Sequence, residues 1–198
     1  EVILQSAPGT IPLVIAGDDV PSPTPSTLVR GVRIHSGDIL VSRGGAPTSA
    51  LIARGNDFPG NFSHIALAHV AAETGAASVI EAHIEVGVVV APAEQYLEDT
   101  KLRIMVLRAW PDLPALEQNP MLPHVAASAA LEEAQRRHIP YDFAMDYEAH
   151  EEQFCSEVAS AAYEGQGVHL WTGLSSMSGP GLARWLGCRR SCSWRRRA

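Results

Sequence analysis

A cysteine near the start of a predicted helix is the first residue in this sequence that could do chemistry. Cys155 lies in an apolar segment whose spacing predicts a helix over residues 153–164, with Gly165 as its stop. In the first turn of a helix, unpaired N–H groups and the helix dipole both stabilise a thiolate. Cys155 is therefore expected to act as a nucleophile towards an acyl carbon.

A nucleophilic thiol also needs a base, and the base needs a group that orients its ring. Residues 62–70 and 77–84 are rich in apolar and β-branched side chains, and Glu73-Thr74-Gly75 between them predicts a hairpin. His64 lies on the first of these strands and Glu81 on the second. The hairpin therefore offers a histidine and an acid that could face each other.

The register of this hairpin decides whether they meet. We expect Val70 to pair with Gly75 across the turn, which places His64 directly opposite Glu81. Opposed residues bring their Cβ atoms to about 5 Å, so a carboxylate can accept a hydrogen bond from an imidazole N–H. His64 is then the base and Glu81 the group that orients it. The other face should line the core with Ile65, Leu67, Ile80 and Ala82.

Other roles for these residues stay open. His83 falls on the same face as Glu81 and could orient the base in its place, whereas His69 is on the opposite face and is expected to be structural. Cys155 could be an inert buried thiol, or could bind zinc with His64 and a second histidine. No short metal-ligand spacing favours zinc. Three nearby acids would oppose thiolate formation and are expected on a solvated face: Glu151, Glu152 and Glu157.

The elements that must position these residues form an α+β domain, a small, mainly antiparallel sheet with helices packed at its side. Further strands are predicted at residues 38–41, 86–91 and 103–107. Further helices are predicted at residues 47–54, 92–99, 119–142 and 181–186. The helix within 119–142 should stop at Ile139-Pro140, and its helical spacing is carried by Leu122, Val125, Ala126, Ala129 and Ala130.

Proline and charge distribution divide the chain into three parts. Residues 1–36 hold five prolines in their first 25 positions and are expected to form an extended arm. Residues 37–187 are expected to form the catalytic domain, and residues 188–198 a basic, solvated tail. The tail holds Arg189, Arg190, Arg195, Arg196 and Arg197, which could contact an anionic membrane surface.

Charge, hydropathy and cysteine content restrict the partners and the location of the chain. The formal charge of −7 argues against nucleic acid, and no apolar run is long enough to span a bilayer. Cys188 and Cys192 could pair with each other, but the cysteines do not form a disulfide framework. The first residue is Glu1, so a targeting peptide could have been removed, and the cell envelope or export is favoured over the cytoplasm. The oligomeric state is not indicated.

Five motifs resemble one family when they are taken in order. They are Gly37-Asp38-Ile39-Leu40, Ser63-His64-Ile65-Ala66, Val79-Ile80-Glu81-Ala82, Pro140-Tyr141-Asp142-Phe143 and Phe154-Cys155-Ser156-Glu157. Over residues 37–164 the chain resembles the circularly permuted NlpC-type papain-like cysteine hydrolases of the YiiX and YebB kind, in which the histidine precedes the cysteine.

The resemblance implies a barrel-like sheet with the cysteine helix beside it, a triad of Cys155, His64 and Glu81, and no cofactor. It also places a tyrosine near the thiol, and the matching residue Tyr141 could donate to the oxyanion together with the N–H of Cys155. Asp38 matches as well, but an aspartate in a turn before a strand is expected to be structural.

Three functions are compatible with these residues. An amidase or peptidase, which the resemblance links to cell-wall peptides, is favoured and predicts a polar cleft and an acyl-enzyme. A lipid acyl hydrolase or acyltransferase predicts an apolar channel beside Cys155. A ligand-binding module with an inactive triad predicts an unreactive Cys155 or a Glu81 that points away from His64.

Overall fold

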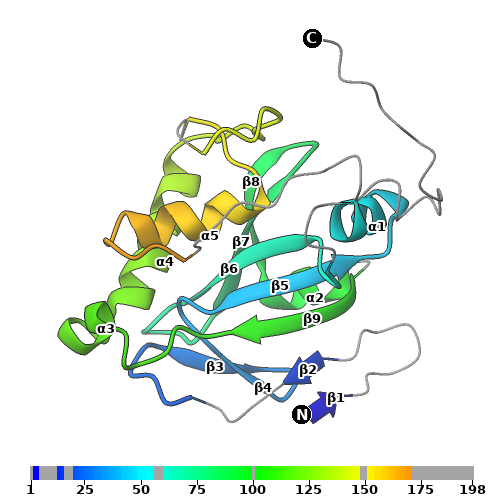
Figure 1. Cartoon of the computed structure of the whole chain (residues 1–198). Helices are drawn as coiled ribbons and strands as arrows, with labels where there is room; N and C mark the ends of the chain where they lie inside the picture. Colours follow the sequence, from blue (N-terminus) through cyan, green and yellow to red (C-terminus); the bar gives the residue numbers. More distant parts are fainter. Residues whose placement is uncertain are drawn as a thin grey trace.

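The computed structural model describes residues 2–4, 13–15, 20–55, 60–99, 101–147 and 151–170. Its centre is a seven-stranded sheet in the order β1-β2-β9-β5-β6-β7-β8, antiparallel except between β2 and β9. The strands are β1 Val2–Leu4, β2 Leu13–Ile15, β5 Ile39–Gly44, β6 His64–Val70, β7 Ala77–His83, β8 Gly87–Pro92 and β9 Lys101–Leu107. With the helices at its side (Figure 1), this sheet confirms the predicted α+β class.

The hairpin of β6 and β7 forms where it was predicted, but with a different register. Val70 pairs with Ala77 and not with Gly75. Gly75 has a φ of +69°, a left-handed conformation that belongs to a turn, and its N–H donates to the carbonyl of Ala71 at 2.8 Å. The second strand therefore begins to pair two residues later than expected, at Ala77, and the loop is longer by these two residues. A slip of two residues keeps every side chain on its predicted face.

A second hairpin covers one face of the sheet and corrects the prediction of an extended arm up to residue 36. Strands β3 (Ser26–Val29) and β4 (Val32–His35) pair around Arg30 and Gly31, which both have positive φ, as a type I′ turn requires. Buried apolar side chains of this hairpin belong to the core: Val29, Val32 and Ile34. The sequence pattern missed the hairpin because prolines precede it closely.

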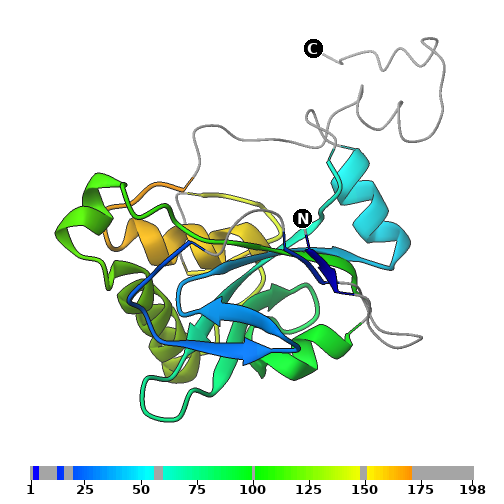
Figure 2. The same cartoon turned by 90° about the horizontal axis from the view of Figure 1, so that it is seen from below.

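Helices cover both faces of the sheet (Figures 1 and 2). One face packs against α3 (Pro114–Gln118), α4 (Leu122–Arg136) and α5 (Cys155–Glu164), and the other against α2 (Ala93–Glu98) and the β3-β4 hairpin. Helix α1 (Pro47–Arg54) follows β5, with the predicted bounds. Helix α3 was not predicted.

The long helix α4 is shorter than predicted: it ends at Arg136, whereas the sequence predicts an end at Ile139. The segment after it is extended, and the carbonyl of Ile139 accepts a hydrogen bond from the N–H of Val88 at 2.9 Å. Val125 is 41% exposed, so the buried face of α4 consists of Leu122, Pro123, Ala126 and Ala127. The carbonyl of Ile139 therefore bonds to β8 and not within the predicted last turn of the helix.

The central strands are buried on both faces. Leu67, Ile80 and Ala82 pack against the helices α4 and α5, as predicted for the core-facing side of the hairpin. Their neighbours Ala66 and Val79 pack towards α2 and the β3-β4 hairpin. Two layers of apolar side chains therefore hold β6 and β7 rigidly, which matters because His64 and Glu81 lie on these strands.

Several predictions concern residues outside the described part of the chain. They are the helix at 181–186, the pairing of Cys188 with Cys192, and the basic tail over 188–198. Within the described residues, no helix has both the length and the apolar character that crossing a bilayer requires.

Candidate active site

Helix α5 places Cys155 at its first position, which is where the sequence pattern put it. The preceding residue Phe154 is the N-cap, and its N–H donates to the carboxylate of Glu157 at 3.0 Å. The N–H of Cys155 has no hydrogen-bond partner among the described residues. This unpaired backbone N–H therefore lies beside a half-buried thiol that forms no disulfide, at the positive end of a helix.

The structure brings His64 and Glu81 into direct contact. The Nε2 atom of His64 lies 2.7 Å from Oε2 of Glu81. The observed register, continued towards His64, puts His83 directly opposite it and Glu81 one diagonal step away. Diagonal neighbours on one face are close enough for long side chains to meet. Because Glu81 takes Nε2, the other ring nitrogen of His64 is the one left to face Cys155.

Glu81 binds a second histidine, which was considered only as its rival from sequence. Nε2 of His83 lies 3.0 Å from Oε1 of Glu81, so each carboxylate oxygen has its own imidazole. Glu81 is only 4% exposed. Two hydrogen bonds from imidazole rings fix the orientation of this buried carboxylate and favour its ionised form. His83 is therefore a partner of Glu81 and not an alternative to it.

Burial and hydrogen bonding act in opposite directions on the pKa of both partners. Burial alone would raise the pKa of Glu81, but hydrogen bonds from His64 and His83 and the charge of Lys101 lower it to about 2. Burial alone would lower the pKa of His64, but hydrogen bonds to Cys155 and Glu81 and their charges raise it to about 9. The site therefore holds an ionised carboxylate and favours an imidazolium over most of the physiological pH range.

Tyr141 lies in the same pocket as Cys155, and a short backbone pairing holds it there. The N–H of Gln153 donates to the carbonyl of Pro140 at 2.9 Å, and the N–H of Asp142 to the carbonyl of Gln153 at 3.3 Å. Burial, followed by the charges of Cys155 and Asp142, raises the pKa of Tyr141 to about 12. Its hydroxyl stays protonated and can donate a hydrogen bond.

The pocket around these residues has a volume of about 190 Å³. Its lining includes the four predicted site residues and a mainly polar rim from β5, α1, the β7-β8 turn and the start of β9. The polar side chains are Ser42, Thr48, Ser49, Ser63, His83, Glu85, Asp99 and Lys101. The geometry therefore provides a thiol, an oriented imidazole and a hydroxyl donor that open to one polar cleft.

Comparison with known proteins identifies the family of this chain. A model of the permuted papain-like amidase family of YaeF and YiiX, called C92, matches residues 33–174. The chain belongs to this family. The C92 amidases are papain-like cysteine hydrolases, so the predicted class of enzyme and its permuted fold are both confirmed.

A solved structure shows the same fold. The metalloprotein yiiX from Escherichia coli O157:H7 superposes on this C92 amidase with a TM-score of 0.55 and 22% identity, over 75% of this chain and 78% of that chain. No curated protein matches the sequence. Among the residues that the structure describes, no three or more His, Cys, Asp or Glu side chains are grouped to hold a metal ion.

Two further carboxylates, those of Glu157 and Asp38, are buried in this chain. Glu151 and Glu152 are exposed, but Glu157 is 2% exposed and caps α5, so the expectation of a solvated Glu157 is wrong. Asp38, expected to be structural, binds the guanidinium of Arg108 through both oxygens, at 2.8 and 2.9 Å.

His69, the other histidine expected to be structural, lies away from the pocket. Its ring stacks on His124 at 5.5 Å between centroids. Burial, and then the neighbouring His124, lower the pKa of His69. A neutral imidazole stacked in this way is a packing element.

Proposed function

We propose that Cys155, His64 and Glu81 are the nucleophile, the base and the orienting carboxylate of an amidase that cleaves short peptide amides. The observation that carries the proposal is the 2.7 Å contact between His64 and Glu81 in the pocket that contains Cys155. A thiol nucleophile, a base and a buried carboxylate that orients the base are the parts that acyl transfer requires.

The reaction follows from these positions. Before attack, His64 already holds the proton of the Cys155 thiol as an imidazolium, and the thiolate attacks the carbonyl carbon of the amide. The N–H of Cys155 and the hydroxyl of Tyr141 donate hydrogen bonds to the oxyanion that forms. The imidazolium of His64 then gives its proton to the leaving amine, which leaves a thioester on Cys155. Water, deprotonated by His64, attacks the thioester and releases the acid and the thiol.

Glu81 acts through His64 throughout this cycle. Its negative charge favours the imidazolium that forms in each half-reaction, and its contact with Nε2 fixes the ring. His83 holds the second oxygen of Glu81 and is a positioning residue.

The pocket supports an amide substrate over a lipid. Most of the side chains around Cys155 are polar, whereas an acyl chain requires an apolar channel. A peptide of the cell-wall type, which the family resemblance implies, carries the polar groups that such a rim can bind. We therefore propose short peptides as the substrate class.

One observation favours the lipid alternative. A hollow of about 670 Å³ adjoins the pocket beyond His83 and Glu81, and Val86, Val89 and Val90 contribute to its wall. An acyl chain could lie on these valines. The same hollow is also lined by Glu98 and Asp99, which disfavour an anionic lipid.

Alkylation of Cys155 by iodoacetamide tests the proposed pair directly. The parent protein carries Cys188→Ser and Cys192→Ser, so that a single thiol reacts. Because an imidazolium stabilises the thiolate, the reaction should stay fast at pH 6, and His64→Ala should slow it there by about tenfold or more. The exposed His138 provides the matched control His138→Ala, which should not change the rate.

The same preparation then separates the two substrate classes. An amidase should hydrolyse short peptide amides through a thioester that mass spectrometry detects on Cys155, and should leave phospholipid vesicles intact. A slow alkylation that does not depend on His64 would contradict the proposal and leave a ligand-binding role. Turnover of vesicle lipid without turnover of peptide amides would replace it by the lipid alternative.

A further inference from the structure

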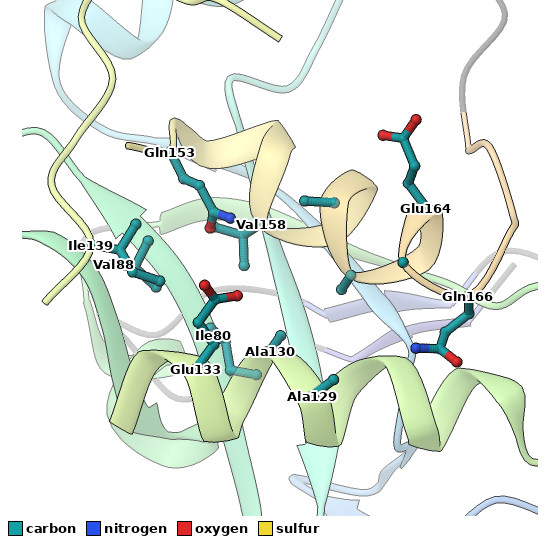
Figure 3. Close-up of a pocket in the computed structure, with 13 residues that line it drawn as sticks. Ile80, Val88, Ala129, Ala130, Glu133, Ile139, Gln153, Val158, Glu164 and Gln166 are labelled. Atoms are coloured by element: carbon teal, nitrogen blue, oxygen red, sulfur yellow. The ribbon is translucent and has the colours of Figure 1, made fainter. Parts of the chain in front are cut away.

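Another cavity, which shares no lining residue with the active-site pocket, is shown in Figure 3. It lies between α4, α5 and the strands β7 and β8, and its volume is about 380 Å³, against about 190 Å³ for the pocket at Cys155. It takes no part in the proposed reaction. Its apolar walls consist of Ile80, Val88, Ala129, Ala130, Ile139, Val158, Ala161 and Ala162.

The cavity exists because both helices present alanines where they face each other. Ala129 and Ala130 lie on α4, and Ala161 and Ala162 on α5. Leucines at these positions would fill the space. Protein interiors are close-packed, with few voids larger than a water molecule, whereas ligand sites start at roughly 300 Å³. The volume therefore falls in the range of a small-molecule site.

One end of this cavity is polar. Gln153 is 7% exposed, and its side-chain amide has no hydrogen-bond partner among the described residues. Figure 3 shows this amide and the carboxylate of Glu133 pointing into the space between α4, α5 and β8. The Oε1 atom of Glu133 is held by Arg137 at 2.8 and 3.0 Å, which fixes the carboxylate in place. The amide is not among the enclosed side-chain groups without a partner, so it reaches the open space of the cavity, where a ligand can bond to it.

The wall of the cavity is also the support of the active site. Gln153 and Ile139 line the cavity, while Cys155 and Tyr141, each two residues further along, line the active-site pocket. The hydrogen bonds between Gln153 and residues 140 and 142 tie the two segments together. A ligand that shifts Gln153 would therefore move Cys155 and Tyr141 relative to each other.

We propose that this cavity is a second binding site, for a small aliphatic carboxamide, and that its occupancy changes the reactivity of Cys155. The apolar walls accept the aliphatic body. The N–H groups of a carboxamide can donate to Glu133 and to the side-chain oxygen of Gln153, and its carbonyl can accept from the nitrogen of Gln153. A carboxylate ligand of the same shape would meet Glu133 as a like charge and is excluded.

Methyl NMR spectroscopy tests the site without any need for catalysis. Isovaleramide should shift the methyl signals of Ile80, Val88, Ile139 and Val158, and isovalerate, with the same body, should bind at least tenfold more weakly. Ala130→Leu should abolish the shifts by filling the cavity, and Gln153→Met should weaken binding at least tenfold. The control Gln135→Leu adds the same side chain on the exposed face of α4 and should leave binding unchanged.

Equal binding of isovaleramide and isovalerate, or binding that survives Ala130→Leu, would overturn the assignment of the site. The coupling has its own test in the single-cysteine protein, where saturating isovaleramide should change the rate of Cys155 alkylation at pH 6 by a factor of two or more. The same factor should vanish in Ala130→Leu. An unchanged rate at full occupancy would overturn the coupling. Neither result depends on the identity of the amide substrate at Cys155.

Discussion

Two buried carboxylates in this molecule have opposite kinds of partner. Asp38 is 1% exposed and binds Arg108, a guanidinium that keeps its charge at any accessible pH. Glu81 is 4% exposed and binds the imidazole rings of His64 and His83, and an imidazole can accept and donate a proton during a reaction. The first pair can only hold the fold together, whereas the second can follow the proton movements of a reaction.

Their places in the fold agree with this difference. Asp38 precedes β5 and also accepts the N–H of His35 at 2.8 Å, so it ties the β3-β4 hairpin and the end of β9 to the main sheet. Glu81 lies on β7 where the sheet meets the start of α5, and it is part of the pocket wall. A buried carboxylate is therefore informative about function only when its partners are known.

Replacing Glu81 should have the largest effect on activity. In Glu81→Gln the amide cannot accept from both histidines, and the charge that favours the imidazolium of His64 is lost. The kcat/KM for a peptide amide should fall by roughly 10³–10⁴-fold, the size seen when the orienting acid of a catalytic triad is neutralised. Steady-state kinetics measure the loss, and circular dichroism checks the fold. A loss below about tenfold would mean that Glu81 does not orient the base.

Replacing Asp38 should act on stability and leave the thiol chemistry alone. Asp38→Asn leaves the guanidinium of Arg108 buried without a counter-charge, and breaking such a pair costs about 3–5 kcal/mol of unfolding free energy. Urea denaturation measures the change. The matched control is Glu98→Gln, which removes the exposed contact with Arg30 and should cost less than about 1 kcal/mol. Equal costs for the two variants would refute the structural role of Asp38.

Acid should weaken the fold through Glu81. Its pKa is about 2 in the folded chain against 4.5 ordinarily, so ionised Glu81 contributes stability that is fully present above pH 4.5 and is lost as the pH falls towards 2. The difference corresponds to about 3 kcal/mol. Between pH 6 and pH 2 the unfolding free energy of the parent protein should therefore drop by about that much more than that of Glu81→Gln. Parallel curves for the two proteins would show that Glu81 is not held ionised by its neighbours.

The parity of strands explains why the contact between His64 and Glu81 could be predicted from sequence and why its details could not. A register error of two residues left His64 and Glu81 on one face, so the pair was predicted although Val70 was matched with the wrong partner. The error came from Gly75, whose positive φ is a property of the folded turn. The sequence pattern therefore predicts well which face of the sheet a side chain occupies, but predicts the length of the connecting loop poorly.

Features that depend on packing between distant segments escaped the sequence. Glu157 reads as a surface acid but is buried, because it caps its own helix against the sheet. The cavity beside Gln153 needs the observed placement of α4 against α5, which alanine content alone does not determine. Both features follow from tertiary contacts and have no periodic signal of their own.

The smallest predicted effect concerns His83 and separates a positioning role from simple packing. His83→Leu removes the hydrogen bond to Oε1 of Glu81, and a bond to a charged group is worth about 1.5 kcal/mol, so kcat should fall roughly tenfold with little change in KM. His83→Gln places an amide N–H near the position of Nε2 and should restore most of the rate. If both variants lost activity equally, His83 would matter through ring packing. Full activity in His83→Leu would show that His64 alone suffices to hold Glu81, and that the second imidazole belongs with Arg108 among the partners that serve the fold.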